Sequence, residues 1–344
     1  MCIVSNLFLS YSQQNLFQTK YSSCGLGMNF KKIENNQKKK VALIGCGLIG
    51  QSWAISFLSA GFCVSLFDPV EGITAQAKEK IAVKLRDLQT NGLIKKTNIS
   101  DYLAKIHLAE NLSSAVRDSI YIQESGPEDL RVKKELTKKI DAVTAKNIPI
   151  ASSTSGIPAS QYASEVKGQY RCLVAHPINP PHLIPAVEIV PAPFTSTSIT
   201  EAVKDIIISI DKEPLELKKE IPGFVVNRLQ GALLSEAFKL VKDGISSAEN
   251  IDKAISEGLG LRWSFMGPFQ TIHLNAPEGI TGYVKRYERM YKDMFNKREI
   301  DWSSIVELGL EEELLSLYKL SERDKHEEQR DTKLTKLILH KNSP

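Results

Sequence analysis

The chain of 344 residues has few cysteines and no long apolar run. Its five cysteines are odd in number and contain no C-x-x-C pair, so they favour free thiols in a reducing compartment, such as the cytoplasm, over a disulfide framework or a zinc site. No apolar stretch approaches the roughly 20 residues that a membrane-spanning helix needs. These shortages argue against a secreted disulfide scaffold and against a membrane protein.

The sequence also lacks an excess of charge of one sign. Lysine and arginine total 44 against 40 acidic residues, and the two signs are interleaved, so no basic stripe points to nucleic acid. We find no internal repeat and no metal-ligand spacing. Hydrophobic residues make up 42% of the chain and charged residues 24%, which is ordinary for a globular protein long enough for two domains.

A glycine-rich motif follows the first apolar run. Val41–Ile44 leads directly into G-x-G-x-x-G, in which the residues are Gly45, Cys46, Gly47, Leu48, Ile49 and Gly50, and a helical pattern follows. A continuous apolar run is typical of a buried parallel strand, and the glycines allow a tight turn into a helix. The unpaired N–H groups and partial positive charge of that helix start would bind a pyrophosphate.

An acid follows the next predicted strand. Residues 63–67 form a second apolar run, and Asp68 comes directly after it. A carboxylate at this point of a dinucleotide-binding fold holds the ribose 2′-OH and repels a 2′-phosphate, which favours NAD over NADP. A chance glycine turn would not account for a strand, helix, second strand and acid in this order.

Two later segments place polar side chains after predicted strands. Glu128 follows the strand 119–124 at the start of a helix, where it could cap the helix or bind a ligand. Ser155 belongs to a hydroxyl cluster after the strand 148–151, where it could contact ligand or act as an N-cap. The carboxyl ends of strands in a doubly wound sheet face the ligand crevice, so both positions are candidates for the site.

A histidine and a glutamate occupy the next two strand-like segments. His176 ends the run 171–176, and Glu188 lies inside the apolar run 184–190, where an unpaired charge would be costly. If the intervening loop reverses the chain, the carboxylate can fix one imidazole nitrogen and make the other a base. The alternative is a core histidine with an unrelated edge glutamate. The combination in a dinucleotide-binding domain favours catalysis.

The chain is predicted to be an α/β protein with an N-terminal Rossmann-type doubly wound sheet and an all-α C-terminal domain. We expect residues 1–38 to be a disordered extension, 39–220 the NAD-binding domain and 221–335 a helical domain for substrate and dimerisation. In the helical domain, Asn227 is a polar residue in an apolar context. The segment 258–263 is predicted to be a loop in which Arg262 clamps a substrate carboxylate or forms a surface salt bridge.

Six motifs in register resemble the 3-hydroxyacyl-CoA dehydrogenase family. They are G-C-G-L-I-G at 45–50, Q-E-S-G-P-E-D-L at 123–130, S-S-T-S-G at 152–156, H-P-I-N-P-P at 176–181, V-E-I-V-P at 187–191 and P-G-F-V-V-N-R-L at 222–229. The resemblance covers about residues 40–293. It is strongest to the branch that contains lambda-crystallin and L-gulonate 3-dehydrogenase, and carnitine dehydrogenases share the G-L-R-W pattern at 260–263.

The resemblance implies a role for each candidate. His176 matches the general base and Glu188 its partner, Ser155 and Asn227 match substrate contacts, and Glu128 and Lys133 match contacts to the nicotinamide half of NAD. It also implies a homodimer formed through the helical domain. We therefore expect NAD-dependent oxidation of a small 3-hydroxy acid. The alternatives are a 3-hydroxyacyl-CoA or carnitine dehydrogenase, or a non-catalytic, crystallin-like NAD-binding protein.

Overall fold

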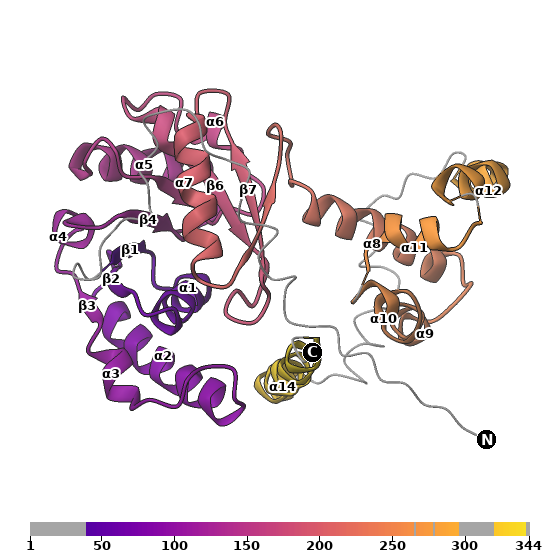
Figure 1. Ribbon diagram of the computed structural model, residues 1–344, viewed down its shortest axis with the longest axis horizontal. Helices are drawn as coiled ribbons and strands as arrows, with labels where there is room; N and C mark the ends of the chain where they lie inside the picture. The colour runs from indigo at the N-terminus through magenta and orange to yellow at the C-terminus, as the bar shows by residue number, and fades with distance from the viewer. Residues whose placement is uncertain (1–38, 265, 278, 296–319, 342–344) are drawn as a thin grey trace, which may run out of the picture. The chain divides into compact units, whose positions relative to one another are not determined.

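The computed structural model describes residues 39–264, 266–277, 279–295 and 320–341 (Figure 1). The extension at 1–38, which the sequence predicts to be disordered, lies outside these residues. So does most of the region beyond about residue 296.

One sheet of eight strands organises the first part of the described chain. Its strand order is β3-β2-β1-β4-β5-β6-β7-β8. All neighbouring pairs are parallel except β6 and β7, which are antiparallel. The strands are β1 Lys40–Ile44, β2 Cys63–Phe67, β3 Ile106–Leu108, β4 Tyr121–Glu124, β5 Ile150–Ser152, β6 Cys172–Pro177, β7 Ala186–Pro191 and β8 Glu213–Glu216. The order reverses between β1 and β4, which is where doubly wound sheets bind ligands.

Apolar side chains cover both faces of this sheet. Along β1, Val41 and Leu43 belong to one buried cluster, whereas Ala42 and Ile44 belong to a second. Successive strand residues point to opposite faces, so a run that is apolar throughout must be buried on both sides. This explains why central strands such as β1 have continuous rather than alternating apolar patterns.

Helices provide the two covering layers (Figure 1). The first cluster includes side chains from α1 Leu48–Ser59, α2 Ile73–Thr90, α3 Ile99–Leu103 and α7 Thr197–Ile208. The second includes side chains from α4 Leu112–Val116, α5 Leu130–Val143 and α6 Ala159–Tyr162. A short 3-10 turn, Gln169–Arg171, leads into β6. The predicted α/β architecture is confirmed.

Only helices follow β8 in the described part of the chain. They are α8 Val226–Lys242, α9 Ala248–Lys253, a π-helical turn Ala254–Leu259, α10 Gly260–Trp263, α11 Pro268–Leu274, α12 Gly279–Phe295, the 3-10 turn Leu320–Glu322 and α14 Arg323–Lys341. Among the described helices, none combines the length and apolar character needed to cross a membrane.

Two sequence predictions need correction. The pattern of 71–106 predicts helices, and α2 and α3 are present, but the helical range is too long because α3 ends at Leu103 and residue 106 starts β3; the two helices are separated by a stretch that begins at Asn91 and Gly92. Gly92 has a φ of +76°, a left-handed conformation that ends a helix. The segment 258–263, predicted to be a loop, is helical throughout, because it closes the π-helical turn and forms α10.

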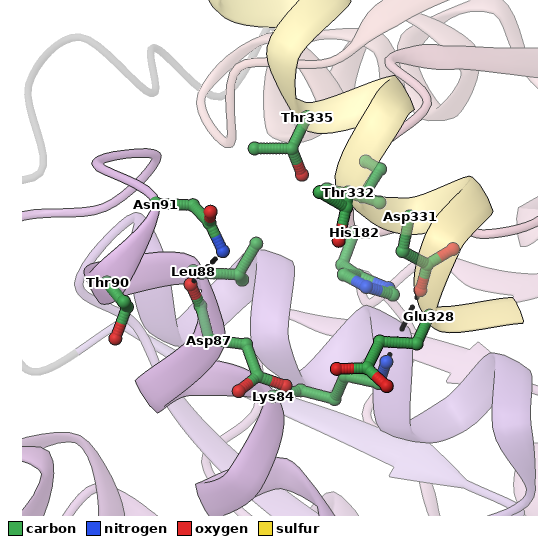
Figure 2. Close-up of a pocket in the computed structure, with 11 residues that line it drawn as sticks. Lys84, Asp87, Leu88, Thr90, Asn91, His182, Glu328, Asp331, Thr332 and Thr335 are labelled. Atoms are coloured by element: carbon green, nitrogen blue, oxygen red, sulfur yellow. Dashed lines mark hydrogen bonds and ion pairs between the residues drawn. The ribbon is translucent and has the colours of Figure 1, made fainter. Parts of the chain in front are cut away.

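A pocket of about 140 Å³ lies between α2 and α14 (Figure 2). The Lys84 Nζ and Asp331 Oδ2 atoms form an ion pair 3.3 Å apart across it, and His182 also lines it. The His182 Nδ1 atom lies 3.2 Å from the Ser52 hydroxyl of α1. Lys84 exposes 44% of its side chain, so it faces solvent while it pairs with Asp331.

Candidate active site

The glycine-rich turn has the form that a dinucleotide needs. Gly45 has a φ of +94°, and an added Cβ there would lie 2.6 Å from the Ser125 carbonyl oxygen. An added Cβ on Gly50 would lie 2.0 Å from the Gly45 carbonyl oxygen. These two glycines are required because the turn packs against the backbone that follows β4, and α1 packs against the turn, too closely for any side chain.

Gly47 differs from these glycines because it faces open space. It precedes α1 without a side-chain cap, and nothing lies within 4 Å of an added Cβ. The first N–H groups of a helix have no partner within the helix, so this start offers donors to an anion. Leu48, in the same turn, exposes 72% of its surface. The turn therefore fits a pyrophosphate, which can approach the backbone where no side chain intervenes.

Asp68 is fixed beside the glycine-rich turn. Its Oδ2 atom accepts a 2.9 Å hydrogen bond from the Cys46 N–H, and its Oδ1 atom accepts one of 3.0 Å from the Val70 N–H. Each carboxylate oxygen retains a second lone pair for a ribose hydroxyl. The carboxylate is thus oriented before any ligand binds, at the end of β2 where the sequence predicts it.

His176 and Glu188 face each other across β6 and β7. They are directly paired in the antiparallel register, and the His176 Nδ1 and Glu188 Oε2 atoms are 2.7 Å apart. Glu188 is fully buried, and His176 is 5% exposed. The predicted pair is therefore present, and it depends on the single antiparallel junction in the sheet.

The second oxygen of Glu188 binds the start of α8. Glu188 Oε1 accepts hydrogen bonds of 2.7 Å from the Val225 N–H and 3.0 Å from the Val226 N–H. Burial raises the pKa of Glu188, but the hydrogen bonds from His176, Val226 and Val225 outweigh burial and hold that pKa below its usual value of 4.5. Glu188 is therefore ionised at neutral pH.

An ionised Glu188 determines the tautomer of His176. A carboxylate can only accept, so the His176 Nδ1 carries the proton and donates it to Glu188. The Nε2 atom then holds a lone pair, and it makes no hydrogen bond with any described residue. Phe224 packs beside the imidazole, with ring centroids 5.7 Å apart, and is itself fully buried. The imidazole is oriented as a base that would accept a proton through Nε2.

The structure also brings Ser155 and Asn227 together. The Asn227 side-chain amide donates a 2.7 Å hydrogen bond to the Ser155 carbonyl oxygen. Ser155 follows β5 and His176 is the residue before the last in β6, so both lie at the same edge of the sheet. The Ser155 hydroxyl makes no hydrogen bond in the described part of the chain. Thr154, not Ser155, caps the following turn, since its Oγ1 atom accepts from the N–H groups of Gly156 and Ile157.

Glu128 and Lys133 lie on the other side of the Ser155 segment. Glu128 Oε1 accepts from the N–H groups of Ser155 and Gly156, at 3.0 and 3.1 Å. Helix α5 is capped instead by Asp129, which accepts from the Val132 N–H. Lys133 is 1% exposed, and its ammonium lies 3.1 Å from Glu124 Oε2. Glu128 is thus half exposed at the edge of the site, whereas Lys133 is inside the domain.

Sequence reasoning overlooked Glu124. It ends β4 and is 2% exposed. A carboxylate at the end of an apolar strand needs a partner, and the same argument singled out Glu188. The buried position of Glu124 thus predicts a buried cation beside it, which in the structure is Lys133.

Arg262 lies exposed on α10. Its guanidinium forms no hydrogen bond or ion pair with the side chain of another described residue. It acts electrostatically on Tyr283, whose pKa is raised mainly by a hydrogen bond with Tyr291 and lowered slightly by Arg262. Among the described residues, Arg262 therefore does not form the surface salt bridge that is the alternative to a carboxylate clamp.

A glycine turn at the sheet's switch point, a carboxylate at the end of β2 and an oriented histidine are the arrangement expected of an oxidoreductase that binds a nicotinamide dinucleotide. The chain belongs to the 3-hydroxyacyl-CoA dehydrogenase family. Residues 40–221 match its NAD-binding domain, and residues 223–311 match its C-terminal domain. NAD is accordingly the cofactor, as the sequence predicts.

Characterised relatives carry three different names. The chain is 39% identical to the human lambda-crystallin homolog over 73% of this chain and 79% of that protein. It is 37% identical to a 3-hydroxyacyl-CoA dehydrogenase of Gibberella moniliformis over 88% of this chain and 95% of that protein. It is 39% identical to an L-carnitine dehydrogenase of Pseudomonas over 69% of this chain and 72% of that protein.

A solved structure shares the whole fold. The NAD⁺-dependent 5-formyl-3-hydroxy-2-methylpyridine 4-carboxylic acid 5-dehydrogenase superposes with a TM-score of 0.74, covering 89% of this chain and 98% of its own. At 24% sequence identity this likeness establishes the architecture alone.

Proposed function

We propose that this protein oxidises a small 3-hydroxy acid, similar to L-gulonate, to the 3-oxo acid. The observation that supports it most is His176, whose Nδ1 atom is held by the buried, ionised Glu188 and whose Nε2 atom is left without a described partner. Oxidation of an alcohol needs a base for the hydroxyl proton, and this histidine is oriented to accept one.

Each residue has a defined task in this proposal. His176 Nε2 takes the proton of the substrate hydroxyl, and Glu188 stabilises the imidazolium that forms. NAD, which the glycine turn and Asp68 would hold, would supply the acceptor for the hydride that leaves C3. Ser155 offers its hydroxyl to the reacting oxygen, and Asn227 holds the Ser155 backbone and faces the same ligand. A general base of this kind contributes on the order of 10²–10⁴-fold to the rate.

The cofactor is held by the first half of the chain. Gly45, Gly47 and Gly50, with Leu48 and Ile49, form the pyrophosphate turn, and Asp68 binds the ribose. Glu128 and Lys133 serve the nicotinamide half, Glu128 at the edge of the site and Lys133 from within the domain. We propose that residues 39–220 form the NAD-binding domain and that residues 221–335 form a helical substrate domain.

The preference for a small acid rests on Arg262. A free guanidinium can bind a carboxylate through two parallel hydrogen bonds, which a thioester cannot offer. The relatives named lambda-crystallin homolog and L-carnitine dehydrogenase support this preference. The rival is a 3-hydroxyacyl-CoA dehydrogenase, favoured by the Gibberella relative, which matches over a larger share of this chain.

Assaying candidate substrates side by side tests the proposal. L-gulonate, L-carnitine and 3-hydroxybutyryl-CoA are each incubated with protein and NAD, and NADH absorbance is followed. We expect the highest kcat/KM with a free 3-hydroxy acid. A higher value with the CoA thioester would favour the rival. NAD binding without turnover of any of them would favour a non-catalytic, crystallin-like role.

The proposal includes a homodimer formed by the helical region. Helix α8 buries none of its side chains in the single chain, although it is amphipathic. Leu229 of α8, Phe269 of α11 and Leu274 of α11 expose 63%, 75% and 64% of their surfaces. Exposed apolar surface of this extent is typical of an interface. Light scattering in line with gel filtration should give twice the mass of one chain.

The free thiols of Cys46, Cys63 and Cys172 favour a cytoplasmic location.

A further inference from the structure

A single carboxylate oxygen organises the segment that carries Ser155. Glu128 Oε1 accepts from the Thr154 hydroxyl at 2.6 Å and from the N–H groups of Ser155 and Gly156 at 3.0 and 3.1 Å. Successive backbone N–H groups that converge on one anion form a concave site of high specificity. Here the anion comes from the protein itself, so the segment has one preferred conformation.

Ser155 is held from its other side as well. Its carbonyl oxygen accepts from the Asn227 side chain at 2.7 Å, so both backbone polar groups of this residue are engaged. Its hydroxyl has no partner among the described residues, and the residue is exposed. The contacts therefore fix the backbone of Ser155 and leave the hydroxyl for a ligand.

Buried charges hold the Glu128 carboxylate in turn. Glu128 Oε2 lies 3.7 Å from the Lys133 ammonium, which lies 3.1 Å from Glu124 Oε2. Glu124 also accepts from the Ser152 hydroxyl and the Gly126 N–H, each at 2.5 Å. Lys133 and Glu124 expose 1% and 2% of their side chains. Because such a pair resists displacement in a low-dielectric interior, it anchors Glu128 from behind.

We propose that Glu128 is a positioning residue for the substrate, acting through the backbone of Ser155, with Lys133 and Glu124 as its support. This inference rests on the proposed function in one respect: Ser155 must contact the hydroxy acid. It goes further in assigning Glu128 to the substrate side of the site. A contact to NAD and a positioning role can be told apart by experiment. Loss of a contact to NAD changes the Kd of NAD, whereas loss of a positioning role changes kcat/KM for the hydroxy acid.

Two variants of Glu128 and a matched control test the inference. Glu128→Ala removes all three hydrogen bonds to the segment. Glu128→Gln retains a carbonyl oxygen that can accept from the same N–H groups, but it has no charge for Lys133. Glu135→Ala is the control, because Glu135 is an exposed carboxylate on the same helix, α5. We measure kcat and KM for the best hydroxy acid, the Kd of NAD, and hydrogen exchange of a peptide that spans 153–157.

Glu128→Ala should lower kcat/KM for the hydroxy acid by roughly ten- to a hundredfold and accelerate exchange at 155 and 156. Glu128→Gln should recover most of the exchange protection and part of the activity. Glu135→Ala should match the wild type. Unchanged exchange and unchanged kcat/KM in Glu128→Ala would overturn the inference, as would an effect confined to the Kd of NAD. If Glu128→Ala does not fold, the same measurements on Glu128→Gln decide. The Gln side chain has no charge for Lys133. Wild-type kcat/KM and wild-type exchange in Glu128→Gln would therefore show that Lys133 does not support the position of Ser155.

The exchange measurement needs no turnover. Faster exchange at 155 and 156 in a protein that oxidises no 3-hydroxy acid would support the positioning of Ser155 and reject the proposed function. Turnover of a 3-hydroxy acid by the wild type, together with wild-type exchange in Glu128→Ala, would support the proposed function and reject the positioning of Ser155 by Glu128.

Discussion

Glu188 lies directly opposite His176 across β6 and β7, and 2.7 Å separates its Oε2 atom from the histidine Nδ1. The same carboxylate accepts from the Val225 and Val226 N–H groups at the start of α8. One buried side chain thus orients the base and secures the first turn of the helical region. Its two functions can be separated by substitution.

Glu188→Gln should retain the contact with α8 and reverse the tautomer of His176. The Gln carbonyl oxygen can accept from Val225 and Val226, which turns the amide NH₂ toward His176 Nδ1. Nδ1 must then accept, Nε2 carries the proton, and the base is lost. We expect kcat to fall at least about a hundredfold, as in His176→Ala, with the Kd of NAD nearly unchanged. A kcat close to that of wild type would remove this pair from the chemistry.

Acid should weaken the folded protein through Glu188. Its pKa in the folded state is held below the usual value of 4.5, so its contribution to stability is fully present above about pH 4.5 and is lost as the pH falls through the folded pKa. The free energy of unfolding, measured by denaturant titration from pH 7 to pH 3, should fall less steeply for Glu188→Gln than for wild type. Parallel curves would contradict this expectation.

Two glycines of the same motif should respond differently to alanine. Gly47→Ala adds a methyl group to open space, so the free energy of unfolding should change by no more than about 0.5 kcal/mol, while the methyl group obstructs the pyrophosphate and raises the Kd of NAD. Gly50→Ala forces a Cβ to 2.0 Å from the Gly45 carbonyl oxygen and should lower the melting temperature itself. Wild-type NAD affinity in Gly47→Ala would place the pyrophosphate elsewhere.

Asp68 should determine the choice between NAD and NADP. Asp68→Asn removes the charge that repels a 2′-phosphate but retains an acceptor for the Cys46 or Val70 N–H. The ratio of NAD to NADP affinity should fall by roughly ten- to a hundredfold, measured by titrating each dinucleotide. Glu79→Gln, which changes an exposed acid of α2, serves as the control. An unchanged ratio in Asp68→Asn would count against the ribose contact.

Arg262 should distinguish acid substrates from thioesters. Arg262→Ala should raise KM for a free hydroxy acid by about tenfold or more, and Arg262→Lys by less, because lysine keeps the charge but not the paired geometry. KM for a CoA thioester should not change. An equal rise for both substrates in initial-rate measurements would indicate a structural role for this arginine.

The sequence predicts the parts of this protein that follow from local rules. The G-x-G-x-x-G turn, β2 and Asp68 were all found because each has a short pattern with a direct physical reason. The pairing of His176 with Glu188 was found because a buried carboxylate requires a partner. The apolar pattern of 199–210 predicts a helix, and α7 covers Thr197–Ile208. The predicted helical region past β8 contains no strand among its described residues.

The segment around Arg262 could not be predicted in the same way. Gly258 and Gly260 suggest a loop, since glycine commonly ends helices. In the structure Gly260 continues a helix, and a Cβ there would lie 2.8 Å from the Ile255 carbonyl oxygen. The glycine is needed because the π-helical turn brings the Ile255 carbonyl close to it, and a π-helical turn has no clear pattern in the sequence. A different reason applies to the contacts of Glu128 with Ser155 and of Asn227 with Ser155, which join segments far apart in the chain.

Because β7 reverses direction directly after β6, the contact of His176 with Glu188 and the contact of Asn227 with Ser155 should be lost at different stages of unfolding. His176 and Glu188 are 12 residues apart in the chain, so little loop-closure entropy opposes their meeting. Ser155 and Asn227 are 72 residues apart, and their contact depends on the start of α8. Partial unfolding of the helices would therefore release Asn227 while the histidine keeps its carboxylate. In a heated or truncated enzyme, the contact between Asn227 and Ser155 should therefore be lost before the contact between His176 and Glu188, so substrate binding should weaken before the general base is lost.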